Sequence, residues 1–206
     1  EQIIISGMAF GIGEKEKLML RSGAKPKDIL ATTGTFGKTA AGFKILLERL
    51  DASADLRKNL VDTVFTPRAR VEEGVALAES GAITASMDSS DGLAISLYDL
   101  QRSSSVGFRV DRLPTAPEAQ RFAELHNLEL SDLVLYGGEE YELVLTVDPD
   151  RIECAKQALR QAGGELIEIG EVTEEKEIVY KDGDQLKPIK AGGWEHFRRS
   201  PLTSSL

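Results

Sequence analysis

Two aspartates three residues apart form the most distinctive chemical pattern in the sequence. Asp88 and Asp91 lie in the segment MDSSDGL at residues 87–93, where a strand-like run gives way to a helix-like one. Mg²⁺ prefers such oxygen ligands and commonly takes one or two carboxylates together with substrate phosphates. Ser90 and the free N–H groups of the following helix start offer contacts to a phosphate oxygen. The same spacing is also typical of a helix cap with Asp88 or Ser90 as the N-cap, so both interpretations stay open.

A second candidate is the segment GGEEYEL at residues 137–143. Its two glycines allow the backbone to come close to a ligand. Glu139 then stands at the start of a strand, where its side chain can project into a cleft. The alternative is a plain turn whose acidic side chains are solvated.

Three arginines and the single tryptophan are weaker candidates. Arg21, in a loop rich in Gly and Pro, has the guanidinium group that binds phosphate oxygens in pairs. Arg68 and Arg70 offer the same chemistry, and for all three the alternative is a surface arginine. Trp194 is suited to stacking on an aromatic or cationic ligand, and equally to covering the core near the C-terminus.

Other catalytic signals are missing from the sequence. There is no Walker-type phosphate loop, and the glycine pair at residues 11–13 lacks the third glycine of a dinucleotide fingerprint. His126 and His196 are too isolated for a zinc site. Cys154, the single cysteine, excludes an internal disulfide framework, and we expect it to pack on an apolar helix face.

Composition and charge narrow the class of protein. The 41% of hydrophobic residues in a chain of 206 predict a buried core. The 25 basic and 34 acidic residues give a net charge of −9, which argues against general binding of nucleic acid or anionic membranes. No apolar run approaches the roughly 20 residues of a membrane span. We therefore expect a cytoplasmic protein, with a local positive or metal-filled site for any anionic substrate.

Hydrophobic periodicity predicts alternating strands and helices, and hence an α/β (α+β layered) fold. The expected strands are residues 3–10, 29–33, 82–87, 106–110, 141–147, 166–172 and 178–180. The expected helices are residues 40–50, 54–64, 71–78, 93–100, 117–126 and 152–162. Because the chain opens at Glu1 directly into an apolar run, we expect residues 1–20 to be the last strand and linker of a largely absent N-terminal domain. Residues 21–199 would then form the C-terminal domain and residues 200–206 a polar tail.

Four segments together resemble the thiamine-monophosphate kinase family of the aminoimidazole ribonucleotide synthetase-like superfamily. They are RSGAKP at residues 21–26, MDSSDGL at 87–93, GGEEYEL at 137–143 and GWEHF at 193–197. The similarity runs from about Ile3 to Phe197, and the segments occur in the family's order. The resemblance implies the C-terminal domain of that fold, a mixed sheet packed with helices.

What the resemblance implies about function is specific. The chain would take part in ATP-dependent phosphorylation of thiamine phosphate to thiamine diphosphate, by direct in-line transfer assisted by Mg²⁺. The metal would be held by Asp88 and Asp91, and ATP phosphates would be contacted by Ser90 and Arg21. Thiamine phosphate would meet Glu139 and Trp194. ATP and thiamine phosphate are thus the expected small-molecule partners.

Departures from the family pattern limit these expectations. Ser89 stands where the family usually has an aliphatic residue, and Glu140 where it usually has aspartate. The family's N-terminal domain, which carries other metal ligands, the nucleotide pocket and the homodimer contact, has no counterpart here. We therefore expect this chain to be inactive alone. The alternatives are another ATP-dependent synthetase of the superfamily, for purines or selenophosphate, and a non-enzymatic domain that binds a phosphate compound.

Overall fold

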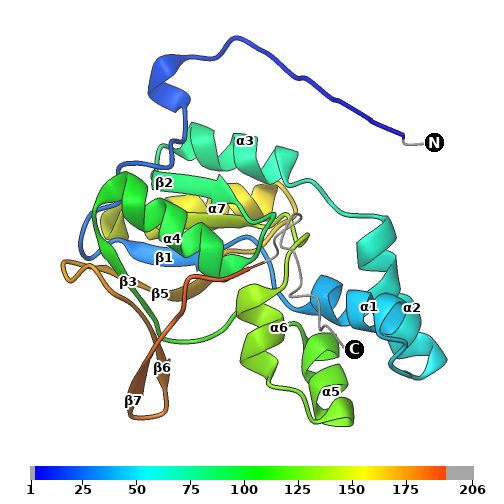
Figure 1. Ribbon diagram of the computed structural model, residues 1–206. Helices are drawn as coiled ribbons and strands as arrows, with labels where there is room; N and C mark the ends of the chain where they lie inside the picture. Colours follow the sequence, from blue (N-terminus) through cyan, green and yellow to red (C-terminus); the bar gives the residue numbers. More distant parts are fainter. Residues whose placement is uncertain (1–2, 194–206) are drawn as a thin grey trace.

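A mixed seven-stranded sheet organises the computed structural model, which describes residues 3–193 (Figure 1). The strand order is β2-β4-β1-β5-β3-β6-β7. All neighbouring strands are antiparallel except β3 and β6, which are parallel. The strands are β1 Ile29–Thr32, β2 Ile83–Asp88, β3 Gly107–Val110, β4 Leu143–Val147, β5 Ile167–Thr173, β6 Ile178–Asp182 and β7 Gln185–Pro188.

Seven α-helices are described. They are α1 Lys38–Leu47, α2 Ala54–Phe65, α3 Val71–Ser80, α4 Leu93–Ser104, α5 Pro117–His126, α6 Leu130–Tyr136 and α7 Ile152–Gln161. Short 3₁₀ turns cover Lys15–Lys17 and Pro149–Arg151. Within residues 3–193, no helix is long and apolar enough to cross a membrane.

Helices cover both faces of the sheet because its central strands are apolar on both sides. Along β4, Val144 belongs to the cluster that α4 closes, whereas the next residue, Leu145, belongs to the cluster under α3 and α7. Leu30 and Ala31 of β1 divide in the same way. This alternation is the period-2 geometry of a strand, and it explains why these strands read as almost continuous apolar runs.

The other four helices, α1, α2, α5 and α6, pack mainly on one another beside the sheet (Figure 1). Their shared core includes Leu60 and Phe122, both fully buried. The closest approach is between α1 and α2, where a Cβ atom added to Gly42 would lie 2.5 Å from the backbone oxygen of Leu60. The loop from β1 to α1 and the loop from α2 to α3 lie at the same end of this helical group, where both line one cavity.

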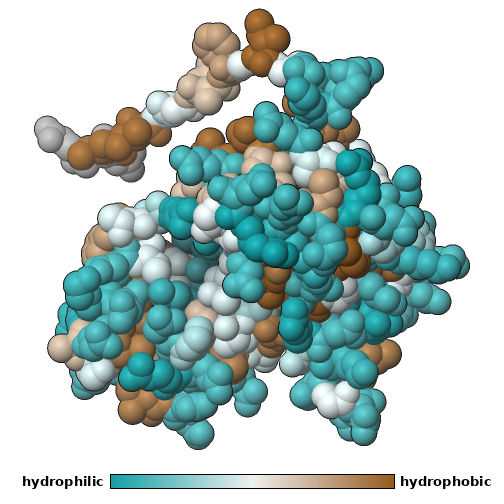
Figure 2. All heavy atoms as spheres, turned by 180° about the vertical axis from the view of Figure 1, so that it is seen from behind, coloured by the Kyte–Doolittle hydropathy of each residue, from teal (hydrophilic) through white to brown (hydrophobic). Residues whose placement is uncertain are grey.

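The expectation of a strand at residues 3–10 is wrong. This segment is extended but pairs with no other strand among the described residues, and it stands away from the domain (Figures 1 and 2). Its apolar side chains are almost fully exposed, Ile3 at 88% and Phe10 at 97%. β-branched residues favour a strand, but a strand needs a neighbour to accept and donate its backbone hydrogen bonds. Met19 packs against the cluster that contains Leu145 of β4, and at the next residue the carbonyl of Leu20 accepts from Ser86 N of β2 at 2.8 Å.

The remaining expected elements are confirmed, with shifts of a few residues at their ends. Pro117 starts α5, and Gly81, at φ 60°, ends α3. Two elements were not expected, α6 and β7.

The expectation for Cys154 is also wrong, because this residue is exposed on α7 rather than packed. The division into residues 1–20, 21–199 and 200–206 stays a prediction.

Gly42 and Gly74 provide a test of helix packing. Gly42→Ala should destabilise the protein by about 1–3 kcal/mol, because the added methyl group has no room between α1 and α2. Gly74→Ala in α3 is the matched control, since the nearest atom to its added Cβ would be Leu143 Cδ1 at 3.6 Å. That change should stabilise the helix by roughly 0.5–1 kcal/mol. Urea unfolding followed by circular dichroism measures both, and equal effects of the two substitutions would contradict the packing described.

Candidate active site

Two acidic loops lie side by side where β2 ends and β4 begins. The antiparallel register pairs Asp88 with Leu143. Backbone hydrogen bonds continue this pairing past both strands, from Ser89 N to Glu142 O at 2.8 Å and from Tyr141 N to Ser89 O at 3.0 Å. Residues 88–91 and 139–142, far apart in the sequence, are thereby held together through their backbones.

Negative charge is concentrated between these loops. The phenol of Tyr141 donates to Glu139 Oε2 at 2.8 Å. This hydrogen bond is the main reason why the pKa of Tyr141 is raised, followed by burial and by the charges of Glu139, Asp88 and Asp91. Among residues 3–193, none of these three carboxylates forms an ion pair. Uncompensated carboxylates of this kind favour a bound cation.

The donor set suits Mg²⁺ better than a fully protein-bound metal. The described part of the chain contains no group of three or more His, Cys, Asp or Glu side chains that could hold a metal ion. Asp88 and Asp91 would therefore contribute at most two ligands, as is common for Mg²⁺, which completes its shell with water and substrate phosphates.

No side chain caps the start of α4. Gly92 occupies this position with φ 112° and no side-chain hydrogen bond to the helix. The interpretation of Asp88 or Ser90 as the N-cap is therefore wrong. A Cβ atom on Gly92 would lie 3.1 Å from the carbonyl oxygens of Gly137 and Leu135, so glycine lets the start of α4 pack closely against the end of α6. Ser90 accepts from Glu139 N at 2.7 Å through its backbone oxygen, and its contact with an ATP phosphate stays a prediction.

The described C-terminal segment passes directly over Asp91. A Cβ atom on Gly193 would lie 2.2 Å from Asp91 O, and the backbone N–H of Lys190 donates to Tyr136 Oη at 3.3 Å. The next residue, Trp194, lies outside the described residues. Its contact with the substrate therefore stays a prediction, although the preceding residue is at the site.

Arg21 is placed against α4. Its Nη1 lies 3.8 Å from Asp99 Oδ2, and more than half of its side chain is exposed. Its backbone oxygen accepts from Ser104 Oγ at 3.3 Å. Nothing in these contacts joins Arg21 to Ser90 or to the aspartates, and its proposed phosphate contact stays a prediction.

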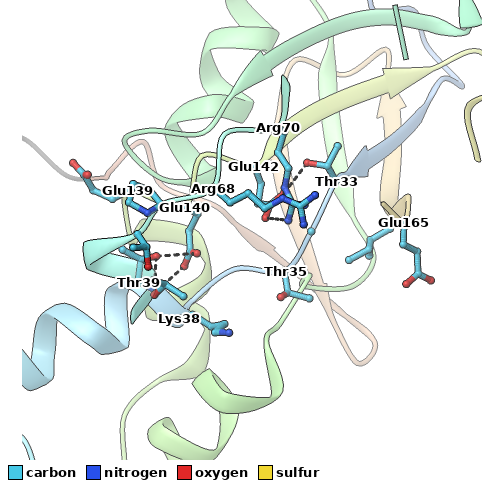
Figure 3. Close-up of a pocket in the computed structure, with 15 residues that line it drawn as sticks. Thr33, Thr35, Lys38, Thr39, Arg68, Arg70, Glu139, Glu140, Glu142 and Glu165 are labelled. Carbon is cyan, nitrogen blue, oxygen red and sulfur yellow. Dashed lines mark hydrogen bonds and ion pairs between the residues drawn. The ribbon is translucent and has the colours of Figure 1, made fainter. Parts of the chain in front are cut away.

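A cavity of about 370 Å³ is lined by Glu139, Glu140 and Glu142 (Figure 3). It is enclosed by the β1–α1 loop, the α2–α3 loop and residues 139–142. At its wall the guanidinium of Arg70 makes two hydrogen bonds to Glu142, of 2.8 and 2.5 Å. Thr33 Oγ1 donates to the same carboxylate at 2.7 Å. Glu142 is thus buried and paired rather than solvated.

Arg70 also reaches a second buried carboxylate, that of Glu73, with Nη1 at 3.0 Å from Oε1. Burial acts to lower the pKa of Arg70, but the bonds and charges of Glu142 and Glu73 raise it overall. Arg68 donates to Glu73 at 2.8 Å and remains 63% exposed. Arg70 is neither a free phosphate ligand nor a surface arginine, because its guanidinium is buried and paired with Glu142 and Glu73. The sequence carried no signal for this pairing beyond the presence of both charges.

Glu140 caps α1 from outside the helix. Its Oε1 accepts from Gly37 N at 2.7 Å and Thr39 N at 3.1 Å, and its Oε2 accepts from Thr39 Oγ1 at 3.1 Å. The N-cap residue Gly37 has no side chain for this purpose and adopts φ 99°. Burial raises the pKa of Glu140 despite these three donors. Glu140, like Glu142, is therefore not a solvated acid.

The chain belongs to the family of AIR synthase related proteins, whose C-terminal domain model matches residues 25–182. Its relatives include the thiamine-monophosphate kinases of Nitrosopumilus maritimus, 34% identical over 186 residues, and Halobacterium salinarum, 37% identical over 187 residues. Both matches cover 90% of this chain and 58% of the relative. The chain thus spans little more than half the length of the curated relatives it matches.

Solved structures agree with this assignment. AaThiL complexed with AMPPCP and TMP superimposes with a TM-score of 0.73 at 28% identity, covering 87% of this chain and 54% of that one. The hydrogenase maturation protein HypE of E. coli, at 20% identity and a TM-score of 0.68, covers 90% of this chain and 54% of that one and shares the fold alone. The expected fold class and the family resemblance are confirmed.

Ser89 offers a test of the packing beneath the site. Its Oγ is buried and, within the described structure, has no hydrogen-bond partner. Ser89→Ala should therefore leave stability unchanged or raise it by about 1 kcal/mol, because it removes an unsatisfied polar group. The control Thr146→Val removes a buried hydroxyl that is bonded to Thr84 Oγ1 at 2.6 Å and should cost about 1 kcal/mol. Thermal unfolding of both variants would contradict the assignment if Ser89→Ala proved the more damaging.

Glu140 should give the protein a specific pH dependence. Because its folded-state pKa lies above the ordinary 4.5, the folded protein binds more protons than the unfolded chain between the two values. Stability contributed by the protonated form is then lost as pH rises through this window. The Glu140→Gln variant lacks this titrating group. The free energy of unfolding of the variant minus that of wild type should therefore rise with pH across this window. Urea unfolding between about pH 4 and 8 tests this, and a constant difference would contradict it.

Proposed function

We propose that this chain is part of a thiamine-phosphate kinase, an enzyme that transfers the γ-phosphoryl group of ATP to thiamine phosphate and forms thiamine diphosphate. One observation carries the proposal. The two motifs expected to bind metal and substrate, at residues 88–91 and 139–142, are joined backbone to backbone, in a chain whose relatives are thiamine-monophosphate kinases.

Each part of the site would have a separate task. Asp88 and Asp91 hold Mg²⁺, which when bound supplies positive charge that neutralises the phosphates of both substrates. Ser90, half-buried just before α4, binds phosphate oxygens of ATP. Arg21 provides a further phosphate contact once its loop meets the nucleotide.

Thiamine phosphate binds at Glu139, in the second of the two joined loops. The carboxylate of Glu139 faces its positively charged ring system, and Trp194 packs on that ring system. Tyr141 fixes the rotamer of Glu139 through its hydrogen bond. The acceptor phosphate oxygen forms a bond to the γ-phosphorus while the bond to the ADP oxygen breaks, with no phosphoenzyme.

The complete site would use more chain than these 206 residues. The matched relatives are longer, and we propose that the uncovered part of such a protein supplies the remaining metal ligands, the nucleotide pocket and the contact of a cytoplasmic homodimer. On that proposal this chain alone is inactive.

The proposal is tested by assaying formation of thiamine diphosphate from ATP, Mg²⁺ and thiamine phosphate. We would compare this chain with a chimaera that adds the uncovered part of the N. maritimus relative. Activity is expected in the chimaera. Asp91→Asn should lower its kcat/KM by about 100-fold or more, because a metal ligand is lost. The control Asp55→Asn, at an exposed position in the first turn of α2, should have little effect.

The absence of thiamine diphosphate from both proteins, with the chimaera folded, would refute the assignment. In that case assays for the purine and selenophosphate synthetases of the superfamily would come next.

A further inference from the structure

Residues 139–142 present their side chains alternately to two different parts of the molecule. Glu139 and Tyr141 are joined to each other and, through their backbone N–H groups, to Ser90 and Ser89. Glu140 and Glu142 bond instead to the start of α1 and to Arg70 (Figure 3). The segment therefore has one side that belongs to the proposed substrate site and one side that anchors it.

The backbone of this segment is strained at the two residues that face the site. Glu139 has φ 68° and Tyr141 has φ 55°, in the left-handed region that residues with a Cβ atom rarely adopt. Such conformations persist only where surrounding contacts enforce them. The backbone bonds to Ser90 and Ser89 act on Glu139 and Tyr141 directly, and the side chains of Glu140 and Glu142 fix the residues between and beside them.

One of these contacts is the ion pair between Arg70 and Glu142. Two hydrogen bonds join the side chains, and both are largely buried, with 15% and 10% of their side-chain surface exposed. Thr33 fixes the end of the segment twice, because its hydroxyl donates to Glu142 Oε2 at 2.7 Å and accepts from Leu143 N at 2.9 Å. A guanidinium held by two carboxylates has little freedom to rotate.

Gly34 in the β1–α1 loop leaves room for the carboxylate of Glu142. A Cβ atom on Gly34 would lie 2.4 Å from Glu142 Oε1 and 2.7 Å from Oε2. Carboxylate ends usually move aside easily, but this one is held by Arg70 and Thr33. Any side chain at position 34 would therefore push Glu142 out of its ion pair.

We propose that the buried Arg70–Glu142 ion pair, seated against Thr33 and Gly34, is a positioning device that holds Glu139 and Tyr141 in place beside Asp88 and Asp91. The assignment of a substrate to Glu139 rests on the function proposed above, whereas the holding of the loop does not. Arg70 and Glu142 act through Glu139 and do not touch the reacting atoms.

Two variants approach the ion pair from different elements. Arg70→Lys keeps the positive charge that Glu142 and Glu73 require, but an ammonium group cannot make the paired contact. Gly34→Ala displaces the carboxylate from the other side. The matched control is Arg109→Lys, which makes the same change in a guanidinium of β3 that bonds Asp111, just after that strand, and Glu171 on β5.

The first measurement is amide hydrogen exchange by NMR on this chain. In Arg70→Lys and Gly34→Ala, the Glu139 and Tyr141 amides should exchange on the order of tenfold faster, while the Leu145 amide in β4 is unchanged. Arg109→Lys should leave all three amides unchanged. Unaltered exchange at Glu139 and Tyr141, or an equal increase at Leu145, overturns the proposal.

The second measurement is steady-state kinetics in the chimaera. Both variants should raise the KM for thiamine phosphate about tenfold and by more than the KM for ATP, with Arg109→Lys unaffected. If an active Arg70→Lys or Gly34→Ala chimaera had the same KM for thiamine phosphate as the unmodified chimaera, the link to Glu139 would be overturned. If the unmodified chimaera forms no thiamine diphosphate, the proposed function fails, and the exchange data alone still decide whether the ion pair holds the loop.

Discussion

When β2 pairs with β4 in antiparallel fashion, the last residue of one strand lies beside the first residue of the other. Asp88 is opposite Leu143, so whatever follows Asp88 must meet whatever precedes Leu143. Both adjoining segments are acidic, and both are extended by backbone hydrogen bonds beyond the strands. The rest of the candidate site is arranged around this junction. It includes the start of α4, which no side chain caps, and Gly193, which lies against Asp91.

The acidic residues of the junction divide by environment into two groups. Glu140 and Glu142 are bound by backbone N–H groups, threonines and Arg70, and they stabilise the way in which helices and loops are joined. Asp88, Asp91 and Glu139 have no cationic partner in the described structure. Carboxylates without a cationic partner are the ones that remain available to a bound cation.

The exposed segment at residues 3–10 shows a limit of local sequence signals. Its isoleucines have strand propensity, yet this propensity reflects packing against neighbouring strands and not an independent backbone preference. The 58% coverage of the matched relatives describes a chain that corresponds to only part of those proteins. Whether residues 3–10 form a strand therefore depends on a pairing partner and not on their own residue types.

The sequence by itself determined most helices and strands, because hydrophobic period, Pro117 and Gly81 act over a few residues. It also determined which segments carry chemistry, since the residue types at 88–91 and 139–142 are unusual wherever they lie. It did not predict α6, a short helix in a mostly apolar run, or β7, an exposed polar edge strand. Nor did it reveal that Gly92 rather than Asp88 or Ser90 caps α4. Only the tertiary structure decided that Arg70 pairs with Glu142, 72 residues away, because such a contact depends on how β1, α3 and β4 are brought together and leaves no periodic trace in the chain.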